Sequence, residues 1–139
     1  MKPERESLAA ALEDLGDRWS LLIVDALSAG PRRFGDVARE LPGIAPNVLS
    51  QRLKHLERLG IVISRPYSRR PHRVAYSLSA RGGELGDAVR LLAKWGSGTA
   101  PEGTAIHHET CGTPLETRWY CPTCADVFER PQDEELRSV

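Results

Sequence analysis

The sequence predicts an α+β fold, with several helices ahead of a two-stranded antiparallel ribbon and one helix after it. Apolar residues recur at spacings of three and four as far as residue 59, as they do along one face of a helix. Apolar and polar residues then alternate from residue 61, as they do in half-buried strands, and helical spacing returns between residues 85 and 95. The 139 residues allow one main domain with roughly thirty residues of appendage.

The composition is that of a soluble globular protein. Hydrophobic residues make up 40% of the chain and charged residues 27%, and no uncharged apolar run approaches the roughly 18 residues that a membrane span needs. Residues 1–16 interrupt their apolar side chains with acidic ones, unlike a secretory signal. We therefore expect a cytoplasmic protein with no membrane partner.

The first two predicted helices are separated by Gly16 and Asp17. Gly16 stands where helices usually end, and Asp17 is a preferred capping residue for the helix that follows. This second helix stops at Gly30 and Pro31. Its apolar face, wide enough for a core helix, consists of Trp19, Leu22, Ile23, Ala26 and Leu27.

A short third helix and a longer fourth helix follow. Pro42 and Gly43 end the third helix in a tight turn, and Pro46 suits the first turn of the fourth, which stops at Gly60. The apolar stripes are Phe34, Val37 and Leu41 in the third helix and Leu49, Leu53, Leu56 and Leu59 in the fourth.

The predicted ribbon has one strand at residues 61–64 and a second at residues 74–79. Residues 65–73 between them are polar, basic and rich in proline, so we expect an exposed hairpin tip, or wing. The last helix follows and is weakened near its start by Gly82, Gly83 and Gly86.

Positive charge is concentrated in the middle of the chain. The formal net charge is zero, but residues 31–73 hold ten basic and three acidic residues. Such an excess can neutralise several phosphates, although solvated surface charge is the alternative explanation. Helices followed by a ribbon with a basic tip are typical of a winged helix-turn-helix, and this order favours double-stranded DNA as the partner.

The fourth helix is the candidate reading helix, because its leucines point inward and leave a polar face that fits the major groove. Asn47 and Gln51 carry amides that can pair with adenine edges, whereas Arg52 and Lys54 suit phosphates or guanine. The wing arginines are expected at phosphates or in the minor groove. His55 is expected at the surface without a base contact. A solvated face on an ordinary helical bundle is the alternative. The predicted DNA-binding residues are Pro46, Asn47, Ser50, Gln51, Arg52, Lys54, Arg69, Arg70 and Arg73.

Five short motifs stand in order along the chain: GDRW at 16–19, GPRRF at 30–34, LPGI at 41–44, LSQRL at 49–53 and YSL at 76–78. With them, residues 8–96 resemble the HxlR-type family of bacterial winged-helix regulators. The resemblance implies a homodimer, held by the first and last helices, that binds inverted-repeat DNA and regulates a nearby gene.

Some members of that family sense aldehydes or oxidants through a cysteine just ahead of the first helix. This sequence has no cysteine before Cys111, which excludes N-terminal thiol sensing here. The homodimer is further supported by apolar stripes on the first and last helices, which could instead pack on their own domain. The predicted interface residues are Leu8, Leu12, Leu15, Leu85, Val89, Leu92 and Trp95.

All three cysteines lie beyond the predicted domain at residues 1–96 and a linker at residues 97–104. His108 and Cys111 form one pair separated by two residues, and Cys121 and Cys124 form another. Two tight turns of this kind can face each other around a tetrahedral, structural Zn²⁺. We therefore expect a zinc-ribbon-like extension at residues 105–130, with a strand around Trp119, ahead of an acidic tail at residues 131–139. Spacing alone does not distinguish His107 from His108 as the fourth ligand.

Other interpretations of this extension remain open. Cys121 and Cys124 could form a redox-responsive dithiol, or the cysteines could be free thiols. A zinc ribbon could also bind a partner protein in addition to the DNA bound by the domain before it.

No enzyme is expected. The chain lacks a Gly-rich phosphate loop and a recognisable Ser/His/Asp arrangement, and Tyr120 stands where a zinc deaminase needs proline. The sequence thus predicts a DNA-binding transcription regulator that acts as a homodimer on inverted-repeat operator DNA. We expect a repressor, because repression is more common than activation. The sequence identifies no effector ligand.

Overall fold

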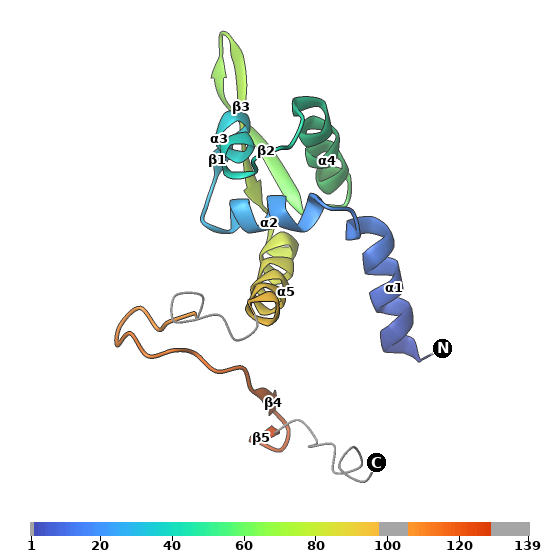
Figure 1. The fold of residues 1–139 in the computed structure, drawn as a ribbon, viewed down its shortest axis with the longest axis vertical. Coiled ribbons are helices and arrows are strands. Elements are labelled where there is room, and N and C mark those ends of the chain that lie inside the picture. The colour runs from blue at the N-terminus through green and yellow to red at the C-terminus, as the bar shows by residue number, and fades with distance from the viewer. Residues whose placement is uncertain (1, 98–105, 129–139) are drawn as a thin grey trace. The chain divides into compact units, whose positions relative to one another are not determined.

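The computed structural model describes residues 2–97 and 106–128. The chain divides into two compact units, Met1–Gly98 and Thr99–Val139. Within the described residues, the first unit contains the helices and a three-stranded sheet, and the second contains a two-stranded sheet (Figure 1).

Five helices occur among the described residues of the first unit, in the order expected. Asp17 sits in the turn before the second of them and accepts hydrogen bonds from the backbone amides of Trp19 and Ser20, as a capping residue does. Leu22 was expected on the buried face of that helix, but its side chain is 43% exposed. The helices are α1 (Pro3–Leu15), α2 (Ser20–Ser28), α3 (Phe34–Glu40), α4 (Pro46–Arg58) and α5 (Ala80–Gly96).

The three-stranded sheet has the order β1-β3-β2, with antiparallel neighbours. Its strands are β1 (Arg32–Arg33), β2 (Val62–Arg69) and β3 (His72–Leu78). Strand β1 was not predicted, and residues 65–73 were expected to form a hairpin tip, whereas strand pairing continues out to Arg69 and His72. Backbone groups pair whether or not the side chains are apolar, so apolar alternation marks only the buried base of this ribbon.

The core lies where α2, α3 and α4 meet the base of the ribbon. Ile23 and Val24 of α2, Val37 of α3 and Leu49 of α4 have no exposed surface. Each such side chain contributes about 1.5–3 kcal/mol through burial. The buried hydrophobic residues are Leu15, Ile23, Val24, Ala26, Leu27, Val37, Leu41, Leu49, Leu53, Leu56, Ile61, Val62 and Val89.

Glycines allow α5 to approach this core closely. A Cβ at Gly82 would lie 2.2 Å from the carbonyl oxygen of Ile61, and one at Gly86 would lie 3.1 Å from the Ser28 hydroxyl. Gly82 and Gly86, which weaken the helix on propensity alone, therefore serve its packing against α2 and the ribbon, whereas Gly83 has no neighbour within 4 Å of such a Cβ.

The second unit contains two hairpin-like turns among its described residues. Strands β4 (Trp119–Cys121) and β5 (Asp126–Phe128) form one, and an isolated antiparallel bridge between His107 and Pro114 closes the other. Strand β4 agrees with the strand expected around Trp119. Among residues 2–97 and 106–128, no helix is long and apolar enough to span a membrane.

Candidate nucleic-acid interface

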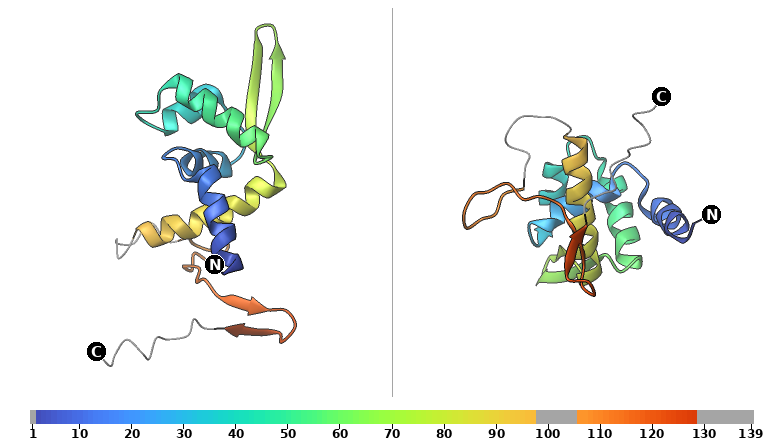
Figure 2. Two further views of the ribbon diagram at one scale, coloured as in Figure 1. Left: turned by 90° about the vertical axis from the view of Figure 1, so that its right-hand side faces the viewer. Right: turned by 90° about the horizontal axis from the view of Figure 1, so that it is seen from below.

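Helix α4 and the β2–β3 wing lie at the same end of the first unit in two perpendicular views (Figure 1, Figure 2). The turn before α4 is tight: Ile44 N–H donates to the Leu41 carbonyl over 3.2 Å, and Gly43 adopts φ 89°. Such a backbone angle favours glycine, so LPGI supplies the turn between α3 and α4. The unit thus has a helix-turn-helix followed by a wing.

The two faces of α4 differ sharply in exposure. Leu49, Leu53 and Leu56 are buried at spacings of four and three, which fixes the rotation of the helix about its axis. Asn47, Gln51 and Lys54 consequently point to solvent, with Ser50 partly buried at the edge. Ala45 caps the helix without a side-chain hydrogen bond, and Pro46 occupies its first turn. The exposed amides stand in the N-terminal half of α4, from which reading helices contact bases.

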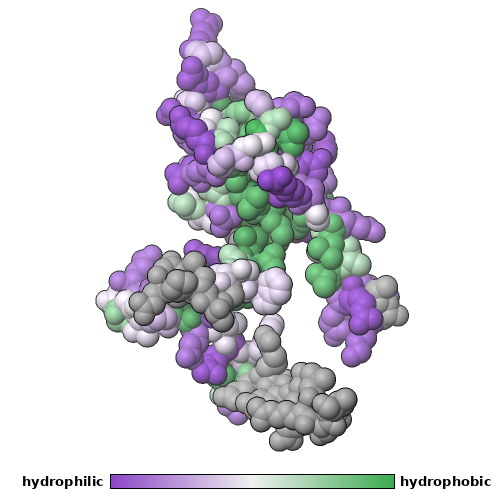
Figure 3. Space-filling view, viewed as in Figure 1, coloured by the Kyte–Doolittle hydropathy of each residue, from purple (hydrophilic) through white to green (hydrophobic). Residues whose placement is uncertain are grey.

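The wing presents the arginines expected of it. Arg69, Arg70 and Arg73 are all exposed, and they cluster where Arg69 pairs with His72 at the end of the ribbon. Figure 3 shows the wing as a hydrophilic projection. Guanidinium groups placed in this way can contact phosphates on either side of a groove.

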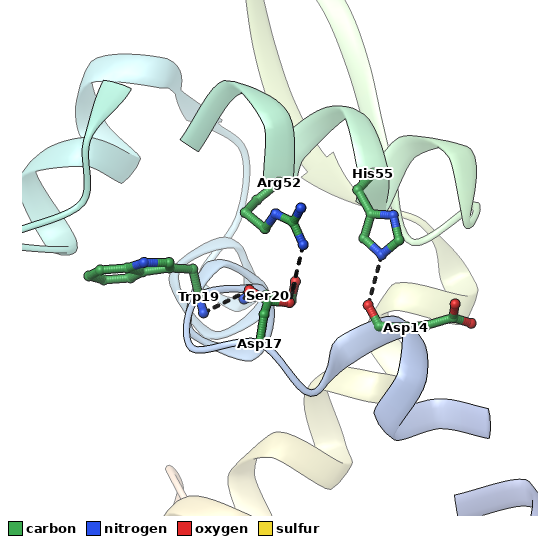
Figure 4. A network of polar contacts seen from close by, with 6 residues as sticks. All are labelled: Asp14, Asp17, Trp19, Ser20, Arg52 and His55. Atoms are coloured by element: carbon green, nitrogen blue, oxygen red, sulfur yellow. Dashed lines mark hydrogen bonds and ion pairs between the residues drawn. The ribbon is translucent and has the colours of Figure 1, made fainter. Parts of the chain in front are cut away.

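Arg52 departs from its expected role because its guanidinium faces the protein. Its Nη1 lies 3.5 Å from Asp17 Oδ1, in the turn between α1 and α2 (Figure 4). Both side chains are about 30% exposed. Arg52 therefore holds α4 against that turn. Although it was predicted to bind DNA, its guanidinium is paired with Asp17 within the protein.

Asp17 organises the same turn. Partial burial raises the pKa of Asp17, but hydrogen bonds from the Ser20 hydroxyl and from the amides of Trp19 and Ser20, with the Arg52 charge, outweigh it and lower the pKa below its ordinary value. Ser20 itself is fully buried. The carboxylate is thus the acceptor that satisfies a buried hydroxyl.

His55 also has a partner that its spacing did not suggest. Its Nε2–H donates to the Asp14 carbonyl at the end of α1 over 2.7 Å (Figure 4). It takes no part in the exposed face of α4. Together, Arg52 and His55 attach α4 to the α1–α2 junction.

A cavity of about 480 Å³ between α3 and the wing brings together basic residues that the sequence reading did not single out. Arg33 stacks on the Tyr67 ring, with its guanidinium carbon 4.7 Å from the ring centroid. Arg39 and His72 line the same cavity. Strand β1 brings Arg33 here by pairing with Ala75, and its two-residue length left no periodic signal in the sequence.

Comparison with known proteins agrees with this architecture. The model of the HxlR-like helix-turn-helix family matches residues 14–104. The chain belongs to the HxlR-like helix-turn-helix family. It is 42% identical over 127 residues to the uncharacterized HTH-type transcriptional regulator MT3179 of Mycobacterium tuberculosis (strain CDC 1551 / Oshkosh), covering 88% of this chain and 80% of that protein.

Solved structures of regulators are similar to this HxlR-like protein. The reduced form of the transcriptional regulator YodB from Bacillus subtilis matches with a TM-score of 0.58 and 33% identity, over 74% of this chain and 98% of YodB. The redox regulator HypR in its oxidised form matches with a TM-score of 0.63 and 28% identity, over 68% and 98%. The HxlR-like chain is thus a helix-turn-helix transcriptional regulator.

The predicted interface residues fall into two groups. Leu15 and Val89 are buried in the core and Leu85 packs against it, so these three stabilise the unit itself. Leu8 and Leu12 on α1 and Leu92 and Trp95 on α5 are exposed, with Trp95 81% accessible. Leu91, which the sequence reading omitted, is also exposed on α5.

The predicted metal ligands form two separate pairs in the second unit. His108 Nδ1 lies 3.2 Å from Cys111 Sγ, and Cys121 hydrogen-bonds to Cys124. Among the residues that the structure describes, no three His, Cys, Asp or Glu side chains converge as a metal site would require. None of the three cysteines forms a disulfide in the structure. Hydrogen bonding with Thr113, and then with His108, lowers the pKa of the exposed Cys111 to about 7.

Proposed function

We propose that this HxlR-like regulator binds inverted-repeat operator DNA as a homodimer and acts as a repressor, with α4 reading bases and the wing contacting the backbone. The observation that supports it most is the exposure of Asn47 and Gln51 on a helix whose opposite face is fixed in the core. Amide side chains on a rigid helix can make the bidentate contacts that select adenine. Mobile surface groups would pay more entropy for the same contacts.

The wing adds affinity that depends little on sequence. Arg69, Arg70 and Arg73 are exposed at its end, and Arg33 stacks near its base. Each phosphate that a guanidinium neutralises releases counterions, so this part of the interface is sensitive to salt. A regulator with a net charge of zero needs such a local concentration of positive charge to hold DNA.

The homodimer is supported by apolar side chains that the monomer leaves uncovered. Helix α1 buries only Leu15 in the first unit, while Leu8 and Leu12 stay exposed. Figure 3 shows hydrophobic residues on α1 and on the neighbouring face of the body. A second copy would cover both faces through one two-fold axis, and that symmetry matches an inverted repeat.

Base readout is tested with a duplex selected from a random-sequence pool by the full-length protein, compared with a scrambled duplex of the same length. Gln51→Ala is expected to weaken binding to the selected duplex by about 1–3 kcal/mol and to leave the scrambled duplex nearly unaffected. Lys54→Ala is the matched control, since an exposed lysine on the same helix acts on phosphates and weakens both. Equal losses for Gln51→Ala on both duplexes would refute the proposal.

The homodimer is tested by light scattering of the full-length chain. Trp95→Glu and Leu8→Glu are expected to shift the mass from dimer to monomer, because a charge at the centre of an apolar interface is costly. Ile63→Glu is the control, as Ile63 is an exposed apolar residue on the wing strand β2. A wild-type monomer at micromolar concentration, or a dimer unaffected by both variants, would overturn this part.

A further inference from the structure

We propose that His108, Cys111, Cys121 and Cys124 bind one structural Zn²⁺ that joins the two turns of the second unit. The donor set of one imidazole and three thiolates is a standard closed zinc site, with four protein ligands and no open position. The proposal rests on the construction of the two turns and on the lack of a core in the residues around them.

The first turn presents His108 and Cys111 at its tip. Leu115 N–H donates to the Ile106 carbonyl over 2.7 Å, and His108 N–H donates to the Thr113 carbonyl over 2.9 Å, so the chain folds back on itself. Gly112 N–H then donates to the His108 carbonyl over 2.7 Å. These bonds hold the His108 imidazole beside the Cys111 sulfur, at 3.2 Å.

The second turn presents Cys121 and Cys124 in the same way. Strands β4 and β5 fold back with Cys121 paired to Asp126. Cys124 lies in the turn at residues 122–125 that directly follows Cys121, so both cysteines stand at the same end of the hairpin.

The two turns share one backbone feature. The residue directly after the second ligand of each pair has a left-handed conformation: Gly112 has φ 71° and Ala125 has φ 54°. Ala125 is the only non-glycine residue with positive φ among the residues described. A left-handed alanine is unfavourable, and such strain is found where a turn must hold functional groups in place. The two turns thus have the same form, and each holds two of the four proposed metal ligands, which favours one metal bound by both.

Residues 106–128, the part of the second unit that the structure describes, also lack a core that would hold these turns. Between residues 106 and 128 only Ile106 and Cys121 are even partly buried, and Trp119, Tyr120 and Phe128 are each more than half exposed. Segments of this size fold when a metal or disulfides replace the missing core. The four ligands do not converge in the structure. Zinc binding supplies the free energy that brings such turns together, so ligand convergence is expected with the metal.

The structure also distinguishes the two neighbouring histidines. His107 is opposite Pro114 in the bridge, whereas His108 is beside Cys111. Successive side chains of an extended segment point to opposite faces, so only one of the two can point to the tip. We therefore assign His108 as the ligand and His107 as its natural control.

The test uses the full-length, untagged chain purified under reducing conditions without chelator. Elemental analysis is expected to give close to one zinc per chain, falling toward zero in Cys121→Ser and Cys111→Ser, falling in His108→Ala and unchanged in His107→Ala. Because a serine variant can simply misfold, Co²⁺ is also added to the metal-free wild type. Intense sulfur-to-cobalt charge-transfer bands and tetrahedral d–d bands are expected at one equivalent.

Four outcomes would overturn the proposal. The first is wild-type protein that contains no zinc and gives no cobalt bands, and the second is half a zinc per chain, as in a site shared by two copies. The third is loss of zinc in His107→Ala but not in His108→Ala. The fourth is zinc-free protein in which a reversible Cys121–Cys124 disulfide changes DNA affinity. Binding to the selected duplex is measured on each sample. Loss of zinc with DNA binding retained would leave the operator-binding function intact, so the two proposals fail separately.

Discussion

The turn between α1 and α2 allows one prediction to be worked out from individual contacts. Asp17→Ala removes the acceptor of two backbone amides at the start of α2, at a cost of about 0.5–2 kcal/mol. It also leaves the fully buried Ser20 hydroxyl without its acceptor, at a cost of about 1–3 kcal/mol. Loss of the partly exposed Arg52 pair adds about 0.2–1 kcal/mol. Together these losses lead us to expect Asp17→Ala to lower the free energy of unfolding by about 2–6 kcal/mol.

Arg52→Ala should be milder, at about 0.5–1 kcal/mol, since its side chain is partly exposed. Urea denaturation followed by far-UV circular dichroism reports on the first unit, because the described helices all lie there. All variants are compared at one protein concentration. A double-mutant cycle between the two positions should give a coupling of about 0.2–1 kcal/mol. Lys54→Ala, on the exposed side of the same helix, should change stability by less than about 0.5 kcal/mol.

The refuting result is specific. The structural role of Arg52 is refuted if Arg52→Ala keeps wild-type stability and shows no coupling to Asp17. If that variant also loses affinity for the selected duplex, Arg52 contacts DNA. Lower stability with nearly wild-type affinity would support the structural role derived above.

Three further predictions concern the wing, the core and the titration of Asp17. Arg70→Ala on the wing should weaken selected and scrambled duplexes alike and reduce the slope of log K against log salt by about one; an unchanged slope in a salt titration would remove Arg70 from the phosphate contacts. Leu53→Ala, at a core position of α4 that is 1% exposed, should lower the free energy of unfolding by about 2–5 kcal/mol in urea, and a loss under about 1 kcal/mol would contradict its packing. The pKa of Asp17 is lower in the folded state, so its stabilisation is complete above the unfolded value of about 3.9 and is lost as pH falls through the folded value. The stability difference between wild type and Asp17→Asn should therefore shrink below about pH 4, and a difference independent of pH would contradict the depressed pKa.

The helices and the inner face of α4 could be predicted because one periodic pattern determines both. Leu49, Leu53 and Leu56 mark the buried face, and the exposed amides follow from 3.6 residues per turn. A residue whose partner is distant in sequence could not be assigned its role from the pattern. Arg52 and Lys54 look equivalent as cations on one helix, and only the position of Asp17 in space separates them. Likewise, β1 exists because β3 offers it a free edge, and two residues carry no pattern of their own.

The zinc and thiol alternatives for the second unit concern cysteines that lie beyond the residues matched by the family model. Residues 14–104 contain no cysteine, so the match to the family model cannot by itself support thiol chemistry in this protein. The alignment with MT3179 covers 88% of the chain, and even an alignment starting at residue 1 would have to continue past residue 104 to reach that share. The matched part of the chain therefore includes the first of the two turns, which the bridge between His107 and Pro114 closes.

The contacts made by α4 have a consequence for how a dimer would read DNA. In the proposed homodimer, α1 supplies part of the interface and α4 reads the bases, so the distance between the two reading helices depends on how α1 is fixed to α4. That connection consists of few contacts: Leu15 is the one residue of α1 buried in the core, and His55 bonds to the Asp14 carbonyl one residue before it. The Arg52–Asp17 pair is at the next turn of the chain. Residues on the inner side of the reading helix would thus set half-site spacing, while those on its outer side select the bases.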